Sequence, residues 1–201
     1  MEPFLLTPAY KDYLWGGNNL KALYGKNSEL APLAETWECS AHPDGMSVIA
    51  TGPYTGWTLA KYIKYFPETL GEHGQEYACL PILVKLIDAE KDLSIQVHPD
   101  DAFAKKHEGQ PGKTEMWYVL CAQPGATLVY GFAHDVTPEL VQSAIVDNTL
   151  LEHLQKVPVH SGDVFLIEPG TVHAIGGGVL LAEVQDCLLY TSDAADDLIG
   201  V

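Results

Sequence analysis

The sequence predicts a mainly β protein, a jelly-roll β-barrel that carries a small helical insertion. Short segments rich in β-branched and aromatic residues recur along the 201 residues, and Gly and Pro turns separate them. Helical spacing is confined to two stretches. Many short strands joined by tight turns are typical of barrels and sandwiches, so we expect one β domain.

The first strands are expected to form a hairpin. Residues 33–43 alternate as a strand up to the turn signal at Pro43-Asp44-Gly45, and residues 46–51 resume as a strand. Residues 58–65 then show the spacing of a helix, with Thr58 available as its N-cap.

A second hairpin is expected in the middle of the chain. Residues 80–88 are almost continuously apolar, which predicts a strand buried on both faces. Residues 93–98 alternate between polar and apolar, and residues 88–91 would turn the chain between the two strands. Residues 100–112 are expected to be a polar connection.

The rest of the chain is expected to be short strands around one helical insertion. Strands at 114–121 and 126–132 are joined by a turn at Gln123-Pro124-Gly125. Residues 138–157 have the apolar spacing of one or two helices, which Pro158 would stop. Further strands are expected at 157–160, 163–167, 172–175 and 179–184.

Composition excludes several classes of protein. A net charge of −16 and a pI near 4.6 argue against a nucleic-acid or anionic-membrane partner. The N-terminal residues do not form a signal peptide, and no apolar run is long enough to span a membrane. The four cysteines are scattered and contain no CxxC pair, which indicates reduced thiols and a cytoplasmic protein.

Four residues form a candidate metal site at the mouth of the barrel. Gln96 and His98 lie two residues apart on the alternating segment, so they point to the same side. Glu115 opens a later strand, and His173 follows a Pro/Gly turn. Two neutral imidazoles, a carboxylate and an amide oxygen suit a divalent ion such as zinc.

Each residue has an ordinary interpretation when it is taken alone. A single histidine, such as His98 or His173, is more often a core or surface residue than a ligand. Lys85 could line a pocket or lie at a sheet edge, and Glu183 could face a site or face outward. Glu115 could be a solvated carboxylate, although its apolar neighbours favour burial, where an unpaired charge is costly.

Two motifs resemble those of the cupin superfamily. The segment GDVFLIEPGTVH, residues 162–173, resembles the second cupin motif, and IQVH, residues 95–98, with a downstream Glu resembles the first. Ordered blocks then narrow the resemblance to the short bacterial form of type I phosphomannose isomerase. These blocks run from about residue 7 to residue 185: YKDYLWGG, AETWECSAHPDG, LPILVKLIDA, LSIQVHPDD, GKTEMWYVL, GDVFLIEPGTVHAIGGG and LLAEVQ.

The resemblance implies a zinc-dependent isomerase that interconverts mannose 6-phosphate and fructose 6-phosphate through an enediol. It implies one Zn²⁺ per chain, a cupin-type jelly-roll fold and a monomer that binds a small sugar phosphate. The implied metal ligands are Gln96, His98, Glu115 and His173. Lys113 and Glu183 are the implied catalytic residues, and the implied substrate-binding residues are Trp15, Glu35, Lys85, Ser94 and Lys113.

The last residues depart from the family pattern. The segment CLLYTSDAADD, residues 187–197, matches a translated sequencing adapter. We therefore expect residues 1–186 to be an incomplete catalytic region, with a helical insertion at about 137–157, and residues 187–201 to be a non-native tail. The family's catalytic Arg would follow residue 186, so a metal- and sugar-binding cupin without turnover is the alternative. A third hypothesis is an iron-dependent cupin oxygenase.

Overall fold

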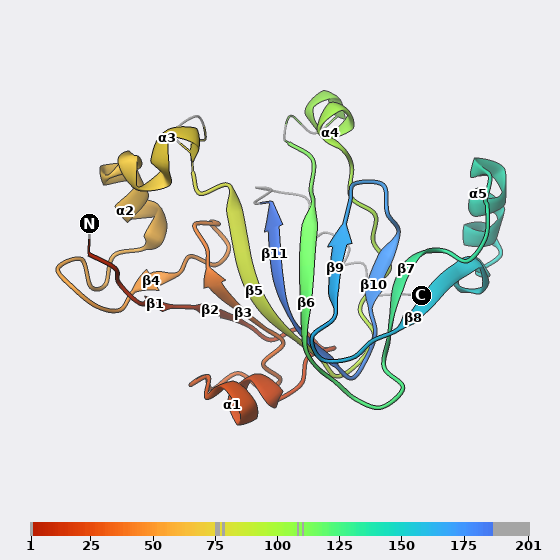
Figure 1. Cartoon of the computed structure of the whole chain (residues 1–201), viewed down its shortest axis with the longest axis horizontal. Helices are drawn as coiled ribbons and strands as arrows, with labels where there is room; N and C mark the ends of the chain where they lie inside the picture. The colour runs from red at the N-terminus through yellow and green to blue at the C-terminus, as the bar shows by residue number, and fades with distance from the viewer. Residues whose placement is uncertain (1, 75–76, 78, 108, 110, 187–201) are drawn as a thin grey trace.

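The computed structural model describes residues 2–74, 77, 79–107, 109 and 111–186, and it is mainly β, as predicted. Three antiparallel sheets make up the β structure (Figure 1). The largest has the order β2 (Ala9–Lys11), β3 (Glu35–Cys39), β5 (Ile82–Ala89), β11 (Val179–Asp186), β6 (Glu115–Ala122) and β9 (Val164–Ile167). A second sheet has the order β10 (His173–Ile175), β7 (Thr127–Phe132) and β8 (Leu154–Pro158), and β1 (Leu6–Thr7) pairs with β4 (Val48–Ile49).

Short helices lie around the periphery of the sheets in Figure 1. They are α1 (Asn19–Tyr24), α2 (Leu59–Tyr65), η1 (Pro67–Leu70), α3 (Gly71–Gly74), α4 (Asp101–His107), α5 (Pro138–Val146) and η2 (Leu150–His153). None of the helices among the described residues has the length and apolar character needed to cross a membrane.

The main core lies between the two larger sheets. Along β6, Trp117 and Val119 are buried while Tyr118 is 42% exposed, so alternate side chains face the core. Leu181 of β11 faces the same core, and Leu128 of β7 contributes to it from the second sheet. The inner face of the six-stranded sheet therefore carries the core, and polar residues on that face must share it.

The predicted cap of the first long helix is confirmed. The Thr58 hydroxyl accepts a hydrogen bond from the Lys61 backbone N–H at 3.2 Å, at the start of α2. This contact satisfies one of the N–H groups that a helix leaves unpaired at its first turn.

The first predicted hairpin is wrong. β3 pairs with β2 on one side and β5 on the other, so neither edge of β3 is free for β4. β4 pairs instead with β1. In the intervening loop, His42 is only 7% exposed and packs edge-on against Trp37.

The second predicted hairpin is also wrong. β5 pairs with β3 and β11, and residues 93–98 form no regular strand. This segment runs extended beside β10, where the backbones of Gln96 and His173 exchange two hydrogen bonds of 2.9 Å. The strand prediction thus gave the wrong partner, but the extended backbone still places Gln96 next to His173.

Helix α4 lies in the segment that was expected to be a polar connection. Asp100 accepts a hydrogen bond from the Phe103 backbone N–H at 2.8 Å and so caps the helix. Asp101 lies in the first turn, and the cations Lys105 and Lys106 lie in the last turn. This charge order favours the helix dipole, and it was the signal that apolar spacing alone did not reveal.

The expected insertion at 137–157 is only partly helical. α5 and η2 form its first part, and Asn148 breaks the helix with a φ of 56°. From Leu154 the chain is strand β8, so Pro158 ends a strand and not a helix. The division into residues 1–186 and 187–201 stays a prediction, because residues 187–201 lie outside the described residues.

Candidate metal centre and adjoining pocket

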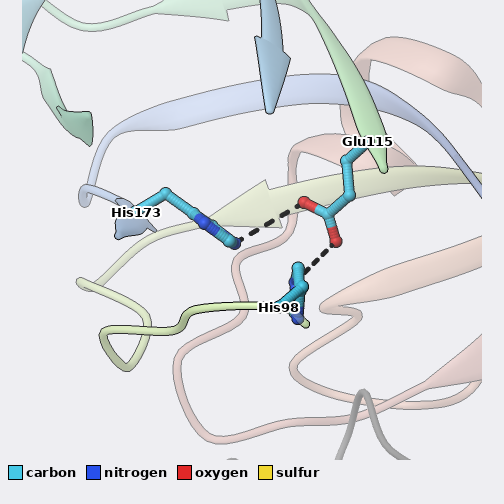
Figure 2. Close-up of side chains that lie close together, drawn as sticks. All are labelled: His98, Glu115 and His173. Carbon is cyan, nitrogen blue, oxygen red and sulfur yellow. Dashed lines mark hydrogen bonds and ion pairs between the residues drawn. The ribbon is translucent and has the colours of Figure 1, made fainter. Parts of the chain in front are cut away.

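Three of the four predicted metal ligands converge at one buried point. One ligand atom from each of His98, Glu115 and His173 lies within 4.8 Å of the other two. Figure 2 shows the Glu115 carboxylate between the two imidazoles: Oε1 is 3.1 Å from Nε2 of His98, and Oε2 is 3.7 Å from Nε2 of His173. The three come from the extended segment, from β6 and from β10, so the fold brings them together.

The imidazole of His173 is oriented for a metal. Its Nδ1 lies 2.8 Å from the Thr171 carbonyl oxygen, which fixes Nδ1 as the protonated nitrogen and leaves the lone pair on Nε2. Burial lowers the pKa of His173 below its ordinary value of 6.5, against the opposing pull of Glu115. The neutral form, which is the form that binds metal, is thereby favoured.

The carboxylate of Glu115 is held in its charged form. Burial by itself raises the pKa of Glu115, but the Lys113 ammonium, His98 and His173 outweigh it and hold the pKa far below its ordinary value. Nζ of Lys113 lies 2.6 Å from Oε1, and both side chains are 3% exposed. A buried anion beside two imidazole nitrogens fits a divalent cation.

The fourth predicted ligand adjoins the same site. Gln96 and Ser94 line the pocket that also exposes Glu115, His173 and Lys113. The Gln96 backbone is bonded directly to that of His173, which anchors the amide side chain beside the imidazole. We call Gln96, His98, Lys113, Glu115 and His173 the metal cluster.

A second group of charges lines the same pocket, and we call it the carboxylate cluster: Glu35, Lys85 and Glu183. Nζ of Lys85 lies 3.3 Å from Oε1 of Glu183 and 3.9 Å from Oε2 of Glu35. All three side chains are at most 5% exposed. Lys85 thus lines the pocket from a central strand, and the sheet-edge interpretation of this residue is wrong.

Trp15 is not among the residues that line this pocket. Its ring stacks on Tyr13 and packs against the main core. Its backbone oxygen accepts hydrogen bonds from Glu90 and Lys91, which ties the turn after β5 to the N-terminal segment.

Sequence reasoning missed three buried polar side chains near these clusters. Trp37 donates its indole N–H to Glu35, and Trp117 donates its own to Glu183. Gln185 lies opposite Glu115 in the register of β11 and β6, and its Oε1 accepts no hydrogen bond from the described residues. Alternation in the EVQ block gave a signal for Gln185, because it places Gln185 on the same face as Glu183.

Comparisons with known proteins agree with this site. Residues 4–119 match the family model described as phosphomannose isomerase type I, catalytic domain. That model covers more than half of the chain. The chain belongs to the type I phosphomannose isomerase family.

Relatives and a solved structure support the assignment. The mannose-6-phosphate isomerase of Streptococcus mutans is 38% identical over 202 residues, which cover 98% of this chain and 63% of the relative. The mannose-6-phosphate isomerase ManA of Bacillus subtilis is 39% identical, over 92% of this chain and 58% of the relative. The crystal structure of mannose 6-phosphate isomerase from Bacillus subtilis superposes with a TM-score of 0.86 at 37% identity, covering 92% of this chain and 59% of that chain.

These matches also show which fold the chain has and how much of its relatives' length it spans. The chain has the cupin-type fold of these isomerases, as predicted. It spans about three fifths of the length of the curated relatives that it matches. The family is metal-dependent, and the buried His98, Glu115 and His173 fit such a metal by their donor atoms and their burial.

Proposed function

We propose that this chain carries the catalytic site of a zinc-dependent isomerase that interconverts mannose 6-phosphate and fructose 6-phosphate through an enediol. The observation that carries the proposal is one pocket lined by the whole carboxylate cluster and by every residue of the metal cluster except His98, whose ligand atom lies within 4.8 Å of those of Glu115 and His173. Relatives named as mannose-6-phosphate isomerases support the choice of substrate.

Zinc is the proposed ion, one per chain. His98, Glu115 and His173 would hold it, with the amide oxygen of Gln96 as a further ligand, because zinc accepts mixed nitrogen and oxygen donors. When bound, the ion supplies a Lewis acid that stabilises negative charge on the sugar oxygens.

The charges that line the pocket indicate which part of the substrate each cluster would bind. Lys113 is buried within the metal cluster, where its ammonium can stabilise an oxyanion or the substrate phosphate. The carboxylate cluster carries two carboxylates and one ammonium, so its net charge disfavours a phosphate there. We therefore infer that the carbon chain and hydroxyls face Glu35 and Lys85, and that Ser94 binds a hydroxyl between the two clusters.

Glu183 is the proposed proton carrier. Aldose–ketose isomerisation moves a proton between C2 and C1, which requires a base in the pocket. Glu183 lines the pocket and is buried on the inner face of β11. Trp15 stays a predicted substrate residue, although its ring packs in the core.

Two further expectations accompany this function. We propose a cytoplasmic location, because Cys39, Cys79 and Cys121 are free thiols and such cysteines suit a reducing compartment. A monomer without nucleic-acid partners stays a prediction, which light scattering and a nucleic-acid binding assay can test.

The test is an isomerase assay on the zinc-loaded chain, with Glu183→Gln as the variant. Mannose 6-phosphate should convert to fructose 6-phosphate, and Glu183→Gln should lower kcat by about 10²- to 10⁴-fold, the usual contribution of a general base. The variant should keep its bound zinc. Binding of sugar phosphate without turnover by the unaltered chain would instead establish the non-catalytic cupin, and full activity in Glu183→Gln would remove Glu183 from the mechanism.

A further inference from the structure

The indole of Trp117 holds one oxygen of Glu183. Nε1 of Trp117 donates to Oε2 of Glu183 at 3.0 Å, and the two residues are 2% and 4% exposed. They lie directly opposite each other in the register of β6 and β11. The register of the two strands therefore produces this contact, because opposite residues of neighbouring strands project to the same face.

Lys85 lies on the other side of Glu183. It is the register partner of Glu183 on β5, so Trp117, Glu183 and Lys85 form a row across three strands. The other oxygen, Oε1, is buried and has the Lys85 ammonium 3.3 Å away as an ion pair, but it accepts no hydrogen bond of good geometry from the described residues. The two oxygens of Glu183 thus have different surroundings: one is fixed by a directional bond and one is not.

We propose that Trp117 is a positioning residue for Glu183, and that it presents Oε1 as the oxygen that carries the proton. This inference rests on the proposed function. Oε1 takes the proton from C2 of the aldose, the C2–H electron pair becomes the C1–C2 double bond, and the carbonyl electrons move onto O1. The proton of the O2 hydroxyl passes to the O1 oxyanion, and the electron pair left on O2 forms the new carbonyl. The electrons of the C1–C2 double bond take back the proton from Oε1 at C1, which gives the ketose.

Glu183 needs a positioning residue because a carboxylate that is free to rotate would lose its alignment with C2 of the substrate. A hydrogen bond to a charged group is stronger than one between neutral groups, and it restricts the last torsion of Glu183 to one setting. General base catalysis depends on this geometry before it depends on basicity. Trp117 supplies the restriction without contributing a charge to the pocket.

Trp117 has a second contact that the test must separate. Its ring packs edge-on against the imidazole of His173, with 5.4 Å between the ring centroids. Loss of the whole ring could therefore disturb the metal ligands. A suitable variant removes the N–H and keeps the aromatic ring.

The experiment compares Trp117→Phe with Trp57→Phe in the zinc-loaded chain. Trp57 packs with Tyr54 and Tyr65 away from the pocket, so it is the matched control. Replacement of residue 117 with the benzothiophene analogue of tryptophan is a second variant, which keeps the shape of the indole without its donor. The assay measures kcat, KM, bound zinc and the primary isotope effect with 2-deuterated mannose 6-phosphate.

Both variants at residue 117 should lower kcat by about 10- to 100-fold with KM and bound zinc unchanged. The isotope effect should rise, because proton transfer becomes slower relative to the other steps. Trp57→Phe should match the unaltered chain in each measurement. Unchanged kcat, or a fall in kcat that accompanies zinc loss with no rise in the isotope effect, would overturn the proposal.

A measurement independent of turnover separates this inference from the function on which it rests. In ¹⁵N-tryptophan-labelled protein, Glu183→Gln should shift the indole N–H resonance of Trp117 and leave that of Trp57 in place. An inactive unaltered chain that shows this shift would overturn the isomerase function and the catalytic role of the contact together, and would leave the contact itself standing. Absence of the shift would overturn the contact.

Discussion

The metal cluster and the carboxylate cluster meet at one pocket, which all of their residues except His98 line, but they balance their buried charges differently. In the metal cluster, Glu115 has Nζ of Lys113 at 2.6 Å and the imidazole nitrogens of His98 and His173 at 3.1 and 3.7 Å. In the carboxylate cluster, Nζ of Lys85 faces both Glu35 and Glu183, at 3.9 and 3.3 Å.

This difference shows which cluster can accept a cation. A buried carboxylate needs a partner charge and hydrogen bonds, because water no longer solvates it. The carboxylate cluster obtains these from Lys85 and from the indoles of Trp37 and Trp117, which are fixed parts of the chain. The metal cluster has one ligand atom from each of His98, Glu115 and His173 within 4.8 Å of the other two, so an ion can complete it.

The largest predicted effect comes from removing the two buried lysines. Without metal, Lys113→Met and Lys85→Met should each lower the free energy of unfolding by about 3–5 kcal/mol, because each removes the ammonium from a buried ion pair. Zinc should stabilise Lys113→Met by more than it stabilises the unaltered chain, since the ion takes over the charge of Glu115. Urea unfolding with and without zinc measures both effects.

Lys85→Met is the matched variant for this comparison. Zinc should stabilise it only as much as it stabilises the unaltered chain, because the ion lies at the other cluster. If zinc gave the two lysine variants equal additional stabilisation, the ion would not be replacing the charge of Lys113 at the metal cluster, and the proposed difference between the clusters would be wrong.

A change in pH is expected to have an effect of intermediate size on the free energy of unfolding. The pKa of His173 is lowered from 6.5 by burial, so below pH 6.5 the unfolded chain binds a proton that the folded chain resists. The stability of the metal-free chain should therefore fall as the pH drops below 6.5. The lowered pKa of Glu115 adds a further loss below 4.5, its ordinary value.

Unfolding by urea from pH 8 to pH 4 measures this dependence. His173→Gln should flatten the curve just below pH 6.5 and leave the loss at lower pH. A curve for the unaltered chain that is flat from pH 7 to pH 5 would contradict the assignment of a buried neutral His173.

The smallest effect on the free energy of unfolding is expected at a position outside both clusters, which serves as a reference. Thr58→Ala removes the side-chain cap of α2 and should lower the free energy of unfolding by about 1 kcal/mol. Zinc affinity and kcat should not change, because Thr58 lines neither cluster. A fall in zinc affinity with this variant would show that metal binding reports general stability rather than the state of the metal cluster.

Local patterns in the sequence were sufficient for elements that depend on near neighbours. Thr58 signalled the start of α2, and the pattern of residues 114–121 predicted strand β6. The ordered motifs identified the family and brought together His98, Glu115 and His173. Their functional roles stay predictions until the experiments above are done.

Pairing between distant strands could not be read from such patterns. The segment of residues 93–98 alternates like a strand, but both edges of its expected partner β5 are filled by β3 and β11. Occupancy of an edge depends on residues far along the chain. The indole contacts of Trp37 and Trp117 were missed for a related reason, since a tryptophan in a buried strand is ordinarily interpreted as core alone.

The most direct test of the central claim is a zinc titration of the metal-free chain by calorimetry. We expect one tight site per chain, weakened by more than about 100-fold in His98→Ala and in His173→Ala, because each variant removes a ligand. His134→Ala, at an exposed histidine, is the matched control and should bind zinc as the unaltered chain does. Zinc binding that survives both ligand variants, or that is lost with His134→Ala, would contradict the metal centre proposed for this pocket.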